Sequence, residues 1–140
     1  TSNKAVATVD AAGKVTVKGP GVAKIIVKAA ATTDYKAASK TVTVTVAPKK
    51  QSISLVNKIK KQLTIKWKKN TKASGYQVVY STNKKFTGKK TVRKAKTTIS
   101  YKIKGLKKGK KYYVKVRSYK TVNGKRIYGA YSTAKKATIK

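Results

Sequence analysis

Residues 106–119 read LKKGKKYYVKVRSY, and this stretch decides the fold because a lysine-rich turn leads directly into a long alternating segment. Side chains along 112–119 alternate between two classes, which is the period of a β-strand with one buried face. The face expected to lie on the core carries Tyr112, Val114 and Val116. The opposite face is expected to carry Tyr113, Lys115, Arg117 and Tyr119.

Most of the remaining chain also predicts short strands separated by turns. Residues 41–46 read TVTVTV and alternate strictly, residues 63–67 and 99–103 alternate as well, and residues 76–80 are expected to form a strand after the turn at Ser74-Gly75. The Asn123-Gly124 pair is a strong hairpin signal, and Gly13 is expected to close another turn after Asp10. No segment has the caps and the period of a helix. The pattern therefore predicts an all-β protein made of β-sandwiches.

The charge changes abruptly near Pro48. The chain carries 37 Lys and Arg against two acids, a net charge of +35. Residues 1–47 hold seven lysines and both acids, whereas residues 48–140 hold thirty Lys or Arg and no acid. We therefore expect one unit at 1–47, a linker at 48–51 and a second unit at 52–140.

The composition argues against catalysis. Histidine, cysteine, methionine and glutamate are absent, so acid–base chemistry near neutral pH has few candidate groups. Zinc would need Cys or His, and calcium would need several carboxylates, but only Asp10 and Asp34 are available. Both are expected to be turn residues. We therefore expect a protein that is not an enzyme and that has no metal, no cofactor and no membrane insertion.

Residues 52–140 resemble a fibronectin type III domain. The resemblance is carried by the pattern Leu63-x-Ile65-x-Trp67, by Gly75-Tyr76-x-Val78, by residues 106–116 and by Gly129-Ala130-Tyr131-Ser132. It implies that Tyr112 is the tyrosine-corner residue, with its hydroxyl bonded to nearby backbone. Trp67 is expected to be a core anchor. The integrin-binding tripeptide of that family is absent, since the corresponding loop, residues 122–126, has no Asp.

Residues 1–47 resemble the second half of a bacterial immunoglobulin-like domain of the group 2 type, found in intimin- and invasin-like surface proteins. The resemblance is carried by Ser2-Asn3, Val6–Asp10, Gly13–Val15, Gly21-x-Ala23-x-Ile25 and Thr43–Val46. A complete domain needs roughly 80–100 residues, so its first strands are missing and a sheet edge would be open. The expected architecture is thus a tandem of immunoglobulin-like and fibronectin type III sandwiches. The expected source is a fragment or processed product of a larger secreted or wall-associated Gram-positive protein, ending at Lys140.

The excess charge predicts binding to a polyanion, because bound polyanions relieve self-repulsion and release counterions. Teichoic acid of a cell wall is the first candidate, and a sulfated glycan or nucleic acid bound without sequence preference stays open. Sequence-specific reading of nucleic acid is not expected, since Lys greatly outnumbers the Arg that forks onto guanine. The candidate contacts are Lys84, Lys85, Lys89, Lys90, Lys107, Lys108, Lys110, Lys111, Lys115, Arg117, Lys125 and Arg126.

Two alternatives compete with diffuse attraction. The interleaved aromatic and basic side chains expected on residues 113–119 could stack sugars or bases, although packing between neighbouring strands explains the same pattern. The whole chain could instead be an adhesin that recognises a host protein. Salt separates these functions, because electrostatic binding fades with salt and a packed interface persists.

Overall fold

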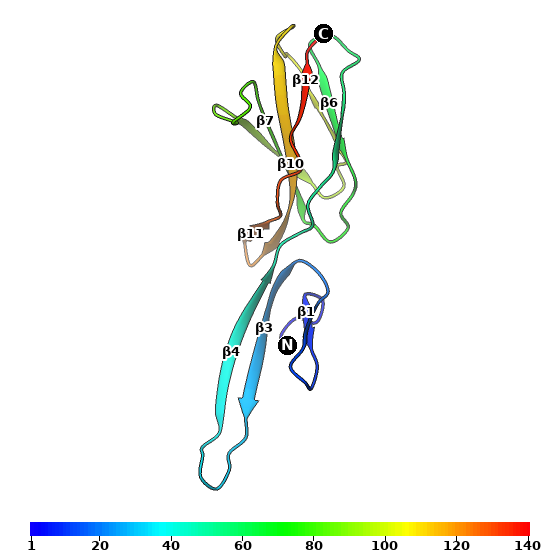
Figure 1. Cartoon of the computed structure of the whole chain (residues 1–140). Coiled ribbons are helices and arrows are strands. Elements are labelled where there is room, and N and C mark those ends of the chain that lie inside the picture. The colour runs from blue at the N-terminus through cyan, green and yellow to red at the C-terminus, as the bar shows by residue number, and fades with distance from the viewer.

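The computed structural model describes residues 1–140 and consists of two parts arranged end to end (Figure 1). All regular elements are strands, so the all-β prediction is confirmed. No helix has the length and apolar character needed to cross a bilayer. The prediction of a β-sandwich is confirmed in the second part.

The first part contains two antiparallel hairpins. One pairs β1 (Ala7–Val9) with β2 (Val15–Val17), and Gly13 between them has a φ of 83°, as the turn pattern predicts. The other pairs β3 (Gly21–Ala29) with β4 (Ala38–Val46) over nine residues each. The long hairpin extends away from the second part (Figure 1).

This first part buries little apolar surface. Its core cluster consists of Val6, Ala7 and Ala23, with Val46 packed against it. Several apolar side chains on the strands stay exposed, among them Ile26 at 57% and Val27 at 58%. The alternation of residues 41–46 predicted one buried face, but Val42 is 45% exposed. The expected face is half-buried only at Val44 and Val46, because the β1–β2 hairpin packs on the long hairpin near Val46 and leaves the rest of it uncovered.

The second part is a sandwich of two antiparallel sheets. The first sheet has the order β5-β6-β9, with β5 at Ile53–Val56, β6 at Leu63–Trp67 and β9 at Ser100–Ile103. The second sheet has the order β8-β7-β10-β11. Its strands are β7 (Gly75–Ser81), β8 (Lys90–Ala95), β10 (Lys111–Val122) and β11 (Lys125–Tyr128).

The long strand β10 organises the second sheet. Its whole middle pairs with β7, while one edge pairs with β11 near Val122 and with β12 (Lys135–Thr138) near Lys111. Between β11 and β12 the edge strand is interrupted, and the Ser132 hydroxyl accepts the Val116 N–H at 3.0 Å. The Val116 N–H therefore keeps a hydrogen-bond partner where the edge strand is interrupted.

Twelve buried side chains from both sheets form the core. The largest fully buried ones include Tyr76, Leu63 and Ile65. Trp67 is 6% exposed and packs against Tyr76 with ring centroids 5.4 Å apart, so it lies in the core as expected. Tyr112, Val114 and Val116 face this core, in agreement with the alternation of residues 112–119.

Candidate anion-binding surfaces

Two lysine-rich loops lie at the same end of the sandwich. The register of β7 against β10 pairs Ser81 with Tyr113, so the end of β7 and the start of β10 meet. A pocket of about 180 Å³ lies between the loops and includes Lys90, Lys104 and Tyr112 in its wall. All the candidate lysines of these loops are exposed: Lys84, Lys85, Lys89, Lys90, Lys107, Lys108, Lys110 and Lys111.

Hydrogen bonds give both loops a defined shape. In the β7–β8 loop the Ser81 hydroxyl donates to the Thr87 carbonyl at 2.8 Å, and Asn83 Oδ1 accepts the Lys85 N–H at 2.8 Å. In the β9–β10 loop the Gly109 N–H donates to the Ile139 carbonyl at 2.8 Å. The lysines therefore extend from ordered backbone, and their ammonium groups are free to meet a ligand.

The tyrosine corner is present but its hydrogen bond is long. Tyr112 packs against the core, and its hydroxyl accepts the Lys107 N–H at 3.4 Å. This contact holds the lysine-rich turn of residues 107–111 against the start of β10.

Lys115 and Arg117 lie on the outer face of the second sheet, where aromatic rings surround them. The Lys115 ammonium is 4.1 Å from the Phe86 ring centroid and 4.4 Å from that of Tyr131. Partial burial lowers the pKa of Lys115, and the positive charges of Lys89 and Arg117 lower it further.

Arg117 is held by its own neighbours on this face. Its guanidinium carbon lies 3.8 Å from the centroid of Tyr128 and 4.3 Å from that of Tyr131. Its Nε also donates to Gln77 Oε1 at 2.6 Å. One face each of Tyr128 and Tyr131 is thus occupied by the protein's own guanidinium group, and Arg126 lies 5.5 Å from the ring centroid of Tyr119.

Lys125 and Arg126 lie at the opposite end of the sheet. They follow the β10–β11 turn, in which Asn123 and Gly124 have φ values of 48° and 73°, as the hairpin signal predicts. The two ends of β10 are roughly 36 Å apart at the usual rise of a strand. The structure therefore does not bring these two cations together with the lysine-rich loops.

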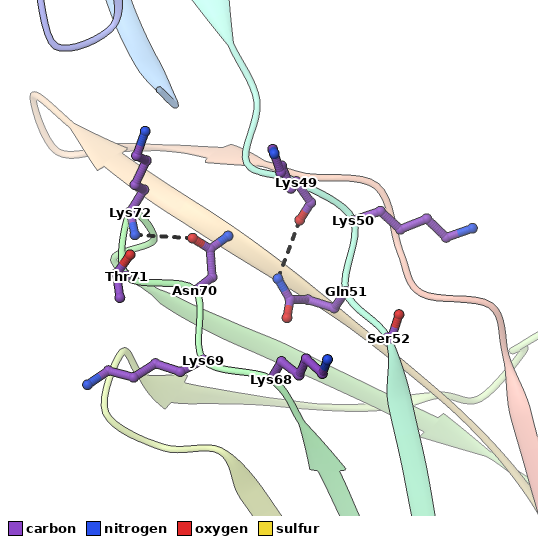
Figure 2. A pocket seen from close by; sticks show the side chains of 9 residues that line it. All are labelled: Lys49, Lys50, Gln51, Ser52, Lys68, Lys69, Asn70, Thr71 and Lys72. Atoms are coloured by element: carbon purple, nitrogen blue, oxygen red, sulfur yellow. Dashed lines mark hydrogen bonds between the residues drawn. The ribbon is translucent and has the colours of Figure 1, made fainter. Parts of the chain in front are cut away.

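A separate basic pocket lies where the first part joins the second, and the sequence analysis did not select it (Figure 2). Its volume is about 360 Å³, and none of its nine wall residues is hydrophobic. The segment before β5 and the β6–β7 loop form its walls. The wall residues are Lys49, Lys50, Gln51, Ser52, Lys68, Lys69, Asn70, Thr71 and Lys72. The lysine pairs 49–50 and 68–69 are visible in the sequence, but their proximity depends on the fold.

The comparisons with known proteins agree with this architecture. The intimin immunoglobulin-like domain model matches residues 1–32, and the fibronectin type III domain model matches residues 46–134. The comparison with curated proteins gave no match. Such domains are generally non-catalytic scaffolds typical of extracellular or surface proteins, and both matches are consistent with a surface module.

Solved structures show the same fold at low sequence identity. The fibronectin type III domain of human contactin 1 is 16% identical with a TM-score of 0.58, covering 68% of this chain and 81% of that one. The sixth such domain of human fibronectin type III domain containing protein 3 is 16% identical with a TM-score of 0.56, covering 69% and 89%. The domain of human collagen alpha-1(XX) is 15% identical with a TM-score of 0.52, covering 64% and 82%. With a family match over well over half of its length, the chain belongs to the fibronectin type III domain family.

Proposed function

We propose that this chain is a non-catalytic extracellular surface module that binds an anionic cell-wall polymer, such as teichoic acid, or another polyanion. It would hold a Gram-positive secreted parent protein at the wall through many lysines. We also propose the division into a partial immunoglobulin-like unit at 1–47, a linker at 48–51 and a fibronectin type III unit at 52–140.

The observation that carries the proposal is the convergence of two lysine-rich loops at one end of the sandwich. Eight exposed lysines project from the β7–β8 and β9–β10 loops and the strand starts beside them. The second part has no carboxylate side chain to neutralise them. A flexible polymer with repeated negative charges could contact many of these ammonium groups at once, because lysine attracts charge without demanding a fixed geometry.

Binding of the purified chain to Gram-positive cell walls tests the proposal. Walls with and without teichoic acid are compared across a salt series. We expect strong binding that needs the teichoic acid and fades as salt rises. Weak binding at low salt, or binding that does not respond to salt, would contradict the proposal.

A second candidate function is adhesion to a host protein through the first part. It is favoured by the apolar side chains that β2, β3 and β4 leave exposed, and by the intimin-type match over residues 1–32. Binding of this kind should persist at high salt and should weaken when Ile26 and Val27 are replaced by Ser. If binding weakens as salt rises but is unchanged by the two substitutions, adhesion through the first part is excluded.

A further inference from the structure

The basic pocket beside the junction of the two parts has walls that buried side chains hold in place. On one wall, the fully buried Ser118 of β10 donates its hydroxyl to the Lys49 carbonyl at 3.2 Å. The buried Gln51 amide lies 3.4 Å from both the Lys49 carbonyl and the Ser118 hydroxyl, and it donates to each. Gly129 allows the backbone of Pro48 to approach so closely that any side chain there would collide with it. The segment carrying Lys49 and Lys50 is therefore fixed against the sandwich.

The opposite wall is fixed in a similar way. The backbone N–H of Asn70 donates to the hydroxyl of the fully buried Tyr76 at 2.6 Å. Asn70 Oδ1 accepts the Lys72 N–H at 3.1 Å, which shapes the turn that carries Lys72 (Figure 2). The β6–β7 loop therefore presents Lys68, Lys69 and Lys72 from an organised backbone.

The chemistry of the wall restricts the ligand. Five of its nine residues are lysines, and the other four, Gln51, Ser52, Asn70 and Thr71, carry neutral hydrogen-bonding groups. An apolar or aromatic ligand would find no hydrophobic partner here, and a cation would be repelled. The absence of Arg favours an anion that needs charge and several donors rather than a planar bidentate contact.

The pocket also touches the first part of the chain. The Lys72 ammonium donates to the Lys18 carbonyl at 2.6 Å, and its side chain extends toward the N-terminal strands, while Lys50 and Lys69 point outward (Figure 2). A neighbouring hollow of about 320 Å³ shares Lys49, Asn70 and Lys72 with the pocket and continues to Val17 and Pro20. A ligand in the pocket would thus lie beside the contact between the two parts.

We infer that this pocket binds one repeating unit of an anionic polymer, namely a tetrahedral phosphate or sulfate ester carried on a hydroxylated polyol or sugar. The summed charge of the five lysines attracts the oxyanion, although Lys72 also binds the Lys18 carbonyl, and Gln51, Ser52, Asn70 and Thr71 take the hydroxyl groups. The inference rests on the proposed function for the class of polymer, and it adds a discrete site to the diffuse attraction of the loops.

Short probes separate this pocket from the loops, because a short probe cannot span the roughly 23 Å of β10 between Lys111 and Ser118. The full-length chain is titrated with a short glycerol phosphate oligomer and, in a parallel arm, with a sulfated disaccharide, and binding is followed by NMR. We expect shifts of the Gln51 and Asn70 side-chain amides with at least one probe, and the responding arm identifies the ester. Shifts confined to residues 82–90 and 104–111 would overturn the inference.

Two variants with a matched control sharpen the test. Replacing Lys68, Lys69 and Lys72 by Gln should weaken binding of the short probe at least about tenfold at low salt. The control replaces Lys84, Lys85 and Lys89 by Gln, which removes the same charge elsewhere, and should leave that binding nearly unchanged. If both triple variants lose the same amount of probe binding, the probe is held by non-specific electrostatic attraction and the pocket is not a discrete site.

Ser118→Ala provides a test in which no charge changes. It removes the hydroxyl that holds the Lys49 carbonyl, so binding of the short probe should weaken while binding of long teichoic acid remains. Unchanged probe binding in folded Ser118→Ala would contradict a preorganised pocket. If the short probe binds the wild-type chain but the long polymer does not, the proposed function is contradicted and the pocket proposal is supported. If the long polymer binds but the short probe does not, only the pocket proposal is contradicted.

Discussion

Gly75 begins β7 at a point where no side chain fits. A Cβ at this position would lie 2.5 Å from the Tyr119 hydroxyl and 2.6 Å from the Lys94 carbonyl oxygen. Tyr119 and Lys94 belong to the two strands that flank β7, so the close approach involves both neighbours of this central strand. The glycine in the Gly75-Tyr76 pattern of the family is therefore explained here by packing across the sheet.

We predict that Gly75→Ala lowers the free energy of unfolding by about 1–3 kcal/mol, because neighbouring groups must shift to admit the methyl group. In a Tyr119→Phe background the loss should be somewhat smaller, since the contact with the hydroxyl disappears while the ring carbon Cζ, 2.7 Å from the added Cβ, and the Lys94 carbonyl remain. Urea unfolding of the four proteins of this double-mutant cycle measures the difference. A loss that is identical in both backgrounds would show that the Tyr119 hydroxyl is not the obstacle.

The raised pKa of Tyr80 leads to a prediction about the free energy of unfolding at high pH. Burial raises the pKa of its phenol above the ordinary value of 10.0, and nearby Tyr101 and Tyr112 raise it further. Its contribution to stability is therefore present below pH 10.0 and is lost as the pH rises from 10.0 through the raised folded-state pKa. Tyr80→Phe should remove this component, so wild type should lose more unfolding free energy than the variant between pH 9 and pH 11. Equal losses in urea unfolding would contradict the assignment.

The elements differ in how far local sequence could predict them. Strands β4, β6, β9 and β10 follow from alternating residues, because a half-buried strand repeats every two residues, whereas β7 is buried at every position and was predicted from its apolar and aromatic composition. Strands β5 and β8 were not predicted, since Ile53–Val56 is short and Lys90–Ala95 is dominated by exposed charge around a single Val92. Their pairing with β6 and β7 is what makes them strands.

The candidate sites show the same limit. The lysine runs at 84–90 and 107–111 were visible in the sequence, but only the register of β7 against β10 places them at one end. The basic pocket was missed because Ser118 contacts Lys49 across 69 residues of sequence. Contacts of this range leave no local periodic signal, whereas the charge pattern that suggests a polyanion is visible without any fold.

The long hairpin of β3 and β4 is predicted to be the least stable regular element. Its strands satisfy each other's hydrogen bonds, but the first part has only four buried hydrophobic residues, Val6, Ala7, Ala23 and Ile25. Local opening should therefore need little free energy. In native-state hydrogen exchange, the paired amides of Ile25, Val27 and Lys40 should exchange at least about tenfold faster than those of Val78 and Val116. Comparable protection would indicate that another surface covers the hairpin.

At the scale of the whole molecule, repulsion among 37 basic residues opposes folding. Salt screens interactions between exposed charges, so the melting temperature should rise with sodium chloride between 20 and 500 mM. For a domain near 100 residues, each kcal/mol of relieved repulsion corresponds to about 4–8 °C. Calorimetry with sucrose as an uncharged control measures the effect. A melting temperature that stays flat or falls with salt would contradict the repulsion.

Multivalent attraction of a polyanion by the lysine-rich loop end is tested most directly by the salt dependence of affinity for purified teichoic acid. The logarithm of the binding constant should fall linearly with the logarithm of salt concentration. Replacing Lys107, Lys108, Lys110 and Lys111 by Gln should reduce both the affinity and the slope. A control with Lys14, Lys24, Lys28 and Lys40 replaced by Gln, all in the first part, should change them far less. Equal changes in both variants, or a slope near zero for the wild type, would contradict the account.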